Sequence, residues 1–235
     1  MSTYLQLCVK TRQECSIPGT GPTAVTGQIG ILKKVVDWVS QAYVDIQNRH
    51  DDWRWMRVGF TVNTTIGVDT YAFGACTDIL TSAAIARFKR WWANDPYQPF
   101  QCFLASAGVG SEYRLIYLPW NNFRQIYKIG AQTNGQPSHV SVDDQDRLVL
   151  GPKPSAVYTV TGDFQRGAQV LTADGDIPDM PASFHDTIMY YGMEKYGADS
   201  VGVEVYQRAK TEGTRMLRAL ERNQKPEFRM AGPLA

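Results

Sequence analysis

Residues 177–197, IPDMPASFHDTIMYYGMEKYG, contain the pattern from which the fold prediction starts. Pro181 fits the first turn of a helix, because the N–H that proline lacks has no intrahelical partner there. Ser183 with Asp186 offers an alternative cap one or two residues later, so two starting points remain open. The stretch therefore predicts a helix that begins near Pro181 and runs to about Gly197.

Apolar side chains cover an unusually wide part of this predicted helix. Placed at about 100° per residue, they fall into two groups, and the strongly polar sector spans only about 100°. We expect the first group to pack in the subunit core. We expect the second to meet the β region of this chain or, as the small number of other strong helices favours, a neighbouring subunit. Gly192 would let a neighbouring backbone approach closely. The first group contains Phe184, Ile188 and Tyr191, and the second contains Met189, Met193 and Tyr196.

Helical periodicity also marks both ends of the chain. Residues 4–15 predict a short first helix, which is followed by a loop rich in Gly, Pro and Thr. Residues 31–50 place their apolar side chains, Trp38 among them, within about 160° and predict a long amphipathic helix. A last helix is predicted from Asp199, as its N-cap, to Asn223.

Between residues 59 and 167 the sequence has the period of β-strands. Short runs, spaced about 8–12 residues apart, alternate apolar and polar residues or are rich in aromatic and β-branched residues. Residues 138–152 predict a hairpin around the turn residues Asp143, Asp144 and Gln145, and residues 119–130 predict a short helix. Other strands are predicted at 59–65, 70–73, 100–105, 112–118 and 156–166.

The order of these elements predicts an α+β fold. The N- and C-terminal helices, in residues 1–57 and 171–225, form one helical bundle core. An antiparallel β-rich domain, residues 58–170, is inserted between them. Residues 226–235 show no periodicity and are expected to form an extended C-terminal tail.

Composition excludes several classes of protein. With 235 residues, 43% hydrophobic residues, 20% charged residues and a net charge of +1, the chain does not bind polyanions through its overall charge. No window approaches the length of an apolar membrane span, and the N-terminal stretch lacks a signal-peptide pattern. The four cysteines have no CxxC spacing, so we expect reduced thiols and no zinc site. They are Cys8, Cys15, Cys76 and Cys102.

A search for catalytic motifs predicts no catalytic, cofactor-binding or metal-binding residues. The glycine-rich stretch 19–27 matches neither phosphate-binding pattern. His185 and Asp186 are adjacent on a helix and point about 100° apart, so the carboxylate cannot orient the imidazole. The carboxylates of Asp143, Asp144 and Asp146 lack the spacing of a calcium loop and fit a turn. A hydrolase that uses His185 or this cluster is the remaining enzyme hypothesis.

Two stretches, residues 51–57 and 87–95, interleave tryptophan with arginine and lysine. This pattern fits three roles: an anchor in the core, a protein interface, or a stacking platform for single-stranded nucleic acid. In the last helix Arg215, Arg218 and Arg222 share one face, which is either a solvated face or a docking face for an acidic partner.

Three stretches, residues 38–57, 123–166 and 176–197, resemble a known family in their order. They are a long helix ending in an acidic-Trp step, a β region closing on a Leu-Gly-Pro-x-Pro turn, and a helix entered through proline. The chain, over roughly residues 4–225, resembles the head-to-tail adaptor (connector, head-completion) proteins of tailed bacteriophages, especially the short-tailed type. Residues from Pro226 onward are not covered by the resemblance.

The resemblance implies a structural virion protein without enzymatic activity or cofactor. Such proteins form a ring, typically of twelve copies, that joins the capsid portal to the tail nozzle or fibre proteins. The ring continues a channel through which double-stranded DNA passes without sequence-specific binding. The protein would be made in the host cytoplasm, lie at the head-tail junction and contact no membrane. Alternatives are a tail terminator, a tail-tube protein or a nucleic-acid-binding module that uses the Trp/Arg clusters.

The resemblance and the residue patterns together provide candidate contact residues. The portal-binding candidates are Arg215, Arg218, Arg222, Phe228 and Arg229. The intersubunit candidates are Met189, Met193, Tyr196, Trp53 and Trp55.

Overall fold

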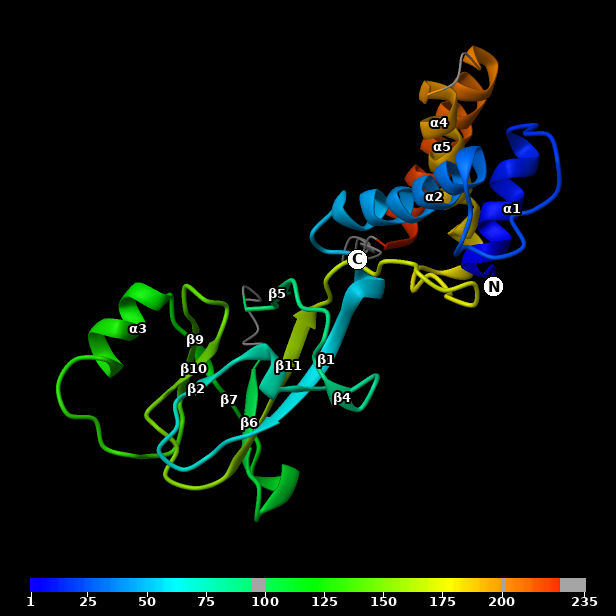
Figure 1. Ribbon diagram of the computed structural model, residues 1–235. Helices are drawn as coiled ribbons and strands as arrows, with labels where there is room; N and C mark the ends of the chain where they lie inside the picture. Colours follow the sequence, from blue (N-terminus) through cyan, green and yellow to red (C-terminus); the bar gives the residue numbers. More distant parts are fainter. Residues whose placement is uncertain (94–99, 200–201, 225–235) are drawn as a thin grey trace, which may run out of the picture. The chain divides into compact units, whose positions relative to one another are not determined.

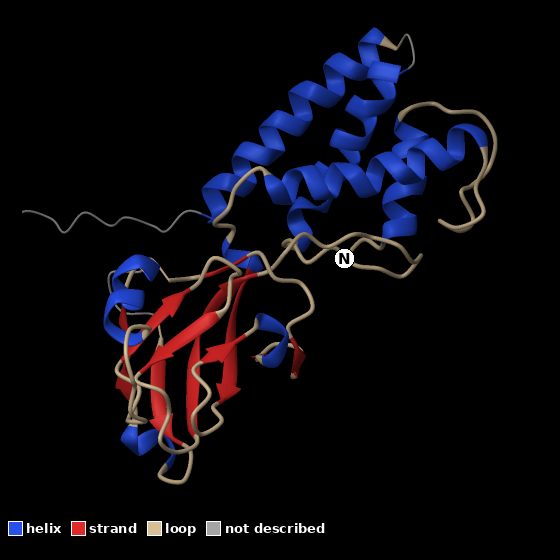
Figure 2. Cartoon of the chain, turned by 60° about the vertical axis from the view of Figure 1, so that its left-hand side comes forward, coloured by secondary structure: helices blue, strands red, loops and turns tan. Residues whose placement is uncertain are grey.

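The computed structural model describes residues 1–93, 100–199 and 202–224, which belong to two compact units (Figure 1). The helical unit consists of Met1–Trp55 and Ala168–Ala235, and the β unit of Met56–Gly167. Helices dominate the first unit and strands the second, as Figure 2 shows. The predicted α+β class is confirmed, with helices from both ends of the chain packed together.

Four α-helices build the described part of the helical unit. They are α1 (Tyr4–Glu14), α2 (Gly30–Asn48), α4 (His185–Asp199) and α5 (Val203–Gln224). Helix α1 starts with a capping box, in which the Thr3 side chain accepts from the Gln6 N–H and the Gln6 side chain accepts from the Thr3 N–H. A 3₁₀ turn, η4 (Ala182–Phe184), precedes α4, so the chain enters this helix just after Pro181. Asp199 is the last residue of α4 and not the predicted N-cap of the last helix, because α5 begins only at Val203.

Helix α4 lies between the other helices of its own chain. It packs against α5, α2 and α1, which together cover most of its circumference. The prediction that Gly192 meets a neighbouring backbone is wrong. A Cβ at this position would face the side chains of Val39 and Thr11, at 3.2 and 3.5 Å. The close backbone approach occurs at Gly197, where a Cβ would lie 2.8 Å from the Cα of Tyr206 in α5. Most of the wide apolar surface of α4, including Ile188, Met189 and Met193, is therefore covered within one subunit, and Tyr196 stays half-buried.

The larger sheet of the β unit contains seven strands and is antiparallel throughout. Its central pair, β1 (Arg57–Asn63) and β11 (Tyr158–Gln165), runs in register from Arg57↔Gln165 to Asn63↔Thr159. The strand order is β4-β3-β1-β11-β6-β7, with β5 also paired to β11. The remaining strands are β3 (Thr77–Asp78), β4 (Ala83–Ala84), β5 (Arg90–Trp91), β6 (Gln101–Leu104) and β7 (Tyr113–Arg114).

The smaller sheet has four strands in the order β2-β10-β9-β8. The predicted hairpin forms β9 (His139–Val142) and β10 (Leu148–Gly151); β2 (Thr70–Tyr71) and β8 (Ile116–Tyr117) flank them. Residues 112–118 were predicted as one strand, but they divide between the two sheets at Leu115. This residue is fully buried, and its N–H donates to the Phe100 carbonyl at 2.9 Å. Leu115 is therefore the corner at which the chain changes sheets.

The two sheets share one apolar core. Phe60 and Phe164 of the larger sheet, with Phe100 just before β6, belong to the same buried cluster as Val140 and Leu150 of the smaller one. Helix α3 (Trp120–Tyr127) packs on this unit through Phe123, which is fully buried. The sequence missed the strands β3, β4 and β5, which have two residues each and do not lie in a longer alternating or aromatic run, as β2, β7 and β8 do.

The β unit begins and ends at adjacent backbone positions. The Arg166 N–H donates to the Met56 carbonyl at 2.8 Å, which continues the β1–β11 ladder by one residue pair. The unit is therefore an insertion whose two ends are already held together by its own central strands.

Candidate interaction surfaces

Three of the five intersubunit candidates lie inside the helical unit. Met193 is fully buried, Met189 is 6% exposed and Trp53 is 2% exposed. The Trp53 indole N–H donates to the Ile46 carbonyl at 3.1 Å, which fixes the ring against the end of α2. All three side chains are almost wholly buried within the helical unit. For Met189 and Met193, α1, α2 and α5 pack on α4, where the sequence had left open the β region or a neighbouring subunit as cover.

The other two candidates, Tyr196 and Trp55, are half-buried. The Tyr196 ring packs edge-on against Trp38 of α2 at a centroid distance of 6.1 Å, and we call these two residues the aromatic patch. Ion pairs from α2 to α4 join Lys34 to Asp199 at 2.8 Å and Lys195 to Asp45 at 2.7 Å. Trp38 was missed as a surface residue because its helical angle lies within the apolar arc of α2.

Trp55 packs within the helical unit on one side. Its ring stacks on Tyr43 at a centroid distance of 6.3 Å, and its backbone N–H donates to the Gln224 side-chain oxygen at 3.2 Å. The contact joins the end of the first chain segment to the last described residue of α5. Trp55 is thus held in place while part of its surface stays open to solvent.

The tryptophans of the β unit do not form an open stacking platform. Trp91 is 5% exposed and packs against Phe60 at a centroid distance of 4.7 Å. The Trp92 ring lies 4.6 Å from the guanidinium of Arg57 and 4.9 Å from that of Arg90. Of the stretch 87–95, residues 94 and 95 lie outside the described residues. The described part fits the core-anchor interpretation better than base stacking.

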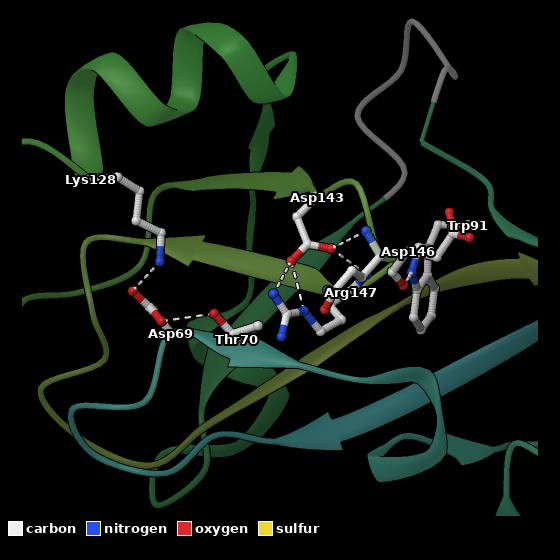
Figure 3. Close-up of polar contacts among 8 residues, drawn as sticks. Asp69, Thr70, Trp91, Lys128, Asp143, Asp146 and Arg147 are labelled. Atoms are coloured by element: carbon white, nitrogen blue, oxygen red, sulfur yellow. Dashed lines mark hydrogen bonds and ion pairs between the residues drawn. The ribbon is translucent and has the colours of Figure 1, made fainter.

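Asp143 organises the hairpin turn that the sequence predicted (Figure 3). Its carboxylate accepts from the N–H groups of Gln145 and Arg147, both at 2.9 Å, and from Arg147 Nε at 2.7 Å. Burial acts to raise the pKa of this carboxyl, but these hydrogen bonds and the guanidinium charge hold it below its ordinary value. The Asp146 carbonyl accepts from the Trp91 indole N–H at 2.7 Å. Within the described residues, no group of three or more His, Cys, Asp or Glu side chains could hold a metal ion.

A second polar contact in Figure 3 fastens α3 to the smaller sheet. Lys128, just after α3, pairs with Asp69 at 2.8 Å, and the Thr70 hydroxyl donates to the same carboxylate at 2.9 Å. Burial acts to raise the Asp69 pKa, yet these partners lower it overall. The carboxylates of Asp69 and Asp143 therefore both have structural partners.

The histidines are engaged in structural contacts. His185 is 2% exposed; its Nδ1 accepts from the Ser2 N–H at 3.2 Å, and its Nε2 lies 3.0 Å from the Met180 carbonyl. His50 Nε2 lies 2.9 Å from Glu221. Asp186, adjacent to His185 in sequence, pairs instead with Lys10 at 3.0 Å. This geometry gives the hydrolase hypothesis no support at His185.

His139 and the cysteines are likewise held in packed surroundings. His139 Nδ1 lies 2.8 Å from the hydroxyls of both Tyr127 and Ser138, and burial lowers the pKa of this histidine. All four cysteines are free and buried, and burial raises the pKa of the Cys8, Cys15 and Cys76 thiols to about 12. No helix in the described part of the chain is long and apolar enough to cross a membrane.

One exposed face of α5 carries the basic residues that the sequence singled out. Arg215, Arg218 and Arg222 are exposed, as is Lys210. Arg215 pairs with Glu212 at 2.8 Å on the same helix. Across residues 1–93, 100–199 and 202–224, Arg218 and Arg222 have no ion-pair partner. We call Lys210, Arg215, Arg218 and Arg222 the basic face; the remaining portal-binding candidates, Phe228 and Arg229, lie outside the described residues.

The chain was compared with protein-family models and with curated proteins. The family model described as SU10 adaptor protein matches residues 2–235, which include both the helical and the β unit. A search of curated proteins finds no match.

Proposed function

The chain belongs to the SU10 adaptor protein family and is thus a bacteriophage adaptor, and from this premise we propose that it forms a ring joining the capsid portal to the tail. This ring has twelve copies of the chain and continues the DNA channel of the portal. The family match over almost the whole chain carries this proposal, since it includes the helical core and the insertion together. Double-stranded DNA passes through the ring without sequence-specific contacts.

Ring formation requires two different surfaces on each subunit, because neighbours in a ring meet head to tail. The aromatic patch, Trp38 with Tyr196, is one such surface. Half-buried aromatic side chains bordered by charged residues are typical of the anchoring centre of a protein interface. Trp55, held against Tyr43 with part of its surface open, is a second candidate.

The basic face of α5 provides the contact with the portal in this proposal. Its arginines extend from a helix that is packed on α4 and therefore rigidly positioned. Phe228 and Arg229 stand four and five residues after the end of this helix in the sequence and complete the set of portal-binding candidates. Tail nozzle or fibre proteins bind the same ring, which has a structural and not an enzymatic role in the virion.

Light scattering after size-exclusion chromatography tests the proposal with the full chain alone and with portal rings from the same virus. We expect co-elution with the portal and, in electron micrographs, an additional ring beneath it. The double variant Trp38→Ala/Tyr196→Ala should form fewer rings, whereas Gln207→Ala, an exposed change on α5, should assemble as the wild type does. A wild-type chain that stays monomeric with the portal, or that binds tail tubes instead, contradicts the proposal.

A further inference from the structure

Helix α5 carries an excess of basic side chains that the fold neutralises only in part. It contains five basic and three acidic residues. Arg208 pairs with Glu14 of α1, and Arg215 pairs with Glu212. Glu221 lies 2.9 Å from His50 and 3.9 Å from Arg49, and among the described residues it makes no ion pair with Arg218 or Arg222. The charges of Arg218 and Arg222 remain without a carboxylate among the described residues.

The two unpaired arginines are close neighbours on the helix surface. At about 100° and 1.5 Å per residue, Arg218 and Arg222 lie about 40° apart around the axis and about 6 Å apart along it. Arginine presents a planar fork of N–H donors, which matches a carboxylate with two parallel hydrogen bonds. Two such forks side by side match a surface that carries at least two nearby carboxylates.

The acidic residue beside the two arginines favours a protein surface over a nucleic acid. Glu221 lies three residues after Arg218 and directly before Arg222, and it lines the same surface hollow as both arginines. Glu204 is about 27 Å from Arg222 along the helix axis and is too far away to act on this site. A phosphate backbone is uniformly negative and meets repulsion from Glu221. A protein surface can place carboxylates opposite the arginines only, and the net charge of +1 gives no general attraction for polyanions.

We propose that Arg218 and Arg222 form the charge-recognition centre of the basic face and bind carboxylates on an acidic protein surface. This inference rests on the proposed function, in which that surface belongs to the portal. Lys210, whose ammonium lies 5.5 Å from the Tyr206 ring centre, borders the site and is not its centre.

The test compares two double variants that remove the same amount of charge. Arg218→Gln/Arg222→Gln removes the unpaired guanidiniums. Lys33→Gln/Arg208→Gln removes two charges that already have partners, Asp37 and Glu14, elsewhere in the helical unit. Binding of each full-length protein to immobilised portal rings is measured at low salt and at about 0.5 M salt, and circular dichroism verifies that each variant is folded.

We expect Arg218→Gln/Arg222→Gln to weaken the Kd for the portal about tenfold or more at low salt, with a smaller difference at high salt. The control variant should stay within about twofold of the wild type, because exposed ion pairs contribute little. If the wild type binds the portal and the Arg218/Arg222 variant binds equally well, the inference is wrong and the proposed function stands. If the wild type does not bind at all, the proposed function itself fails.

Two further measurements identify a different occupant. The first is binding to duplex DNA of random sequence. If the Arg218/Arg222 variant loses this binding and still binds the portal, the inference is wrong, and the two arginines bind DNA phosphates. Loss of self-association without portal would instead place the acidic surface on a second copy of the chain.

Discussion

Asp143 illustrates how one residue decides the geometry of a turn. The sequence offered three carboxylates, Asp143, Asp144 and Asp146, and predicted a turn from all of them. Only Asp143 accepts the N–H groups of residues two and four positions later, because it stands at the end of β9 where the chain reverses. Asp146 has a φ of 56° and offers its carbonyl to Trp91, a contact that no local pattern reveals.

Replacing Asp143 by Asn should make the β unit less stable in a pH-dependent manner. The folded pKa of Asp143 lies below its ordinary value, so its charge contributes stability above about pH 4, and this contribution is lost as pH falls through the folded pKa. At pH 7 we expect a loss of about 1–3 kcal/mol, as for a buried hydrogen-bonded carboxylate. Urea unfolding at several pH values measures this loss in the free energy of unfolding. A difference between wild type and variant that grows as pH falls below 4 would contradict a stabilising role for the charged Asp143.

Helix α4 shows how a whole element can be covered within its own chain. Its sequence correctly indicates that apolar side chains must be covered on more than one side. The number of strong helices suggested that the chain lacked enough cover, but α1, α2 and α5 together supply it. Gly197 permits this, since α5 approaches so closely there that a Cβ would contact the Tyr206 backbone.

Met193→Asp should therefore unfold the isolated subunit and not merely prevent assembly. A carboxylate at a fully buried position without a partner is expected to cost more than about 3 kcal/mol. Thermal unfolding followed by circular dichroism at low protein concentration measures this loss. Tyr196→Ala is the matched comparison on the same helix, and its half-buried ring should cost clearly less. A stable, helical Met193→Asp monomer would show that α4 depends on a neighbouring subunit.

At the scale of the whole molecule, the chain consists of a helical unit interrupted by a β insertion. The insertion starts and finishes on the paired strands β1 and β11, and the Met56 carbonyl accepts from the Arg166 N–H. These two residues have the hydrogen bond that joins the first and fourth residues of a β-turn. A two-residue turn could therefore connect Met56 to Arg166 in place of the insertion.

Replacing residues 57–165 by Asn-Gly should leave the helical unit folded. The dipeptide supplies the two central residues of a tight turn between Met56 and Arg166. We expect a helical circular dichroism spectrum and a cooperative thermal transition, because the contacts of α1, α2, α4 and α5 lie within their own unit. A control with Gly-Gly in place of Asn-Gly separates turn preference from insertion removal. An unfolded chain in both cases would mean that the helical unit requires the β unit.

Local periodicity determined which parts of this protein are helical and which are strands, and so the α+β class followed from the sequence. The short strands, the corner at Leu115 and the start of α5 at Val203 did not follow, because elements so short or so close to a helix end have no periodic pattern of their own. Among the candidate surfaces, residue spacing alone placed Arg215, Arg218 and Arg222 on one face of the last helix, but it did not include Lys210.

Only the tertiary structure decided which of those residues are available to a partner. Arg208 is paired with a residue 194 positions away, Arg218 and Arg222 have no ion-pair partner in the described part of the chain, and Met193 is buried in the core of the subunit. The physical reason is that a periodic pattern specifies the face of an element, whereas burial and charge pairing depend on what the rest of the chain brings to that face.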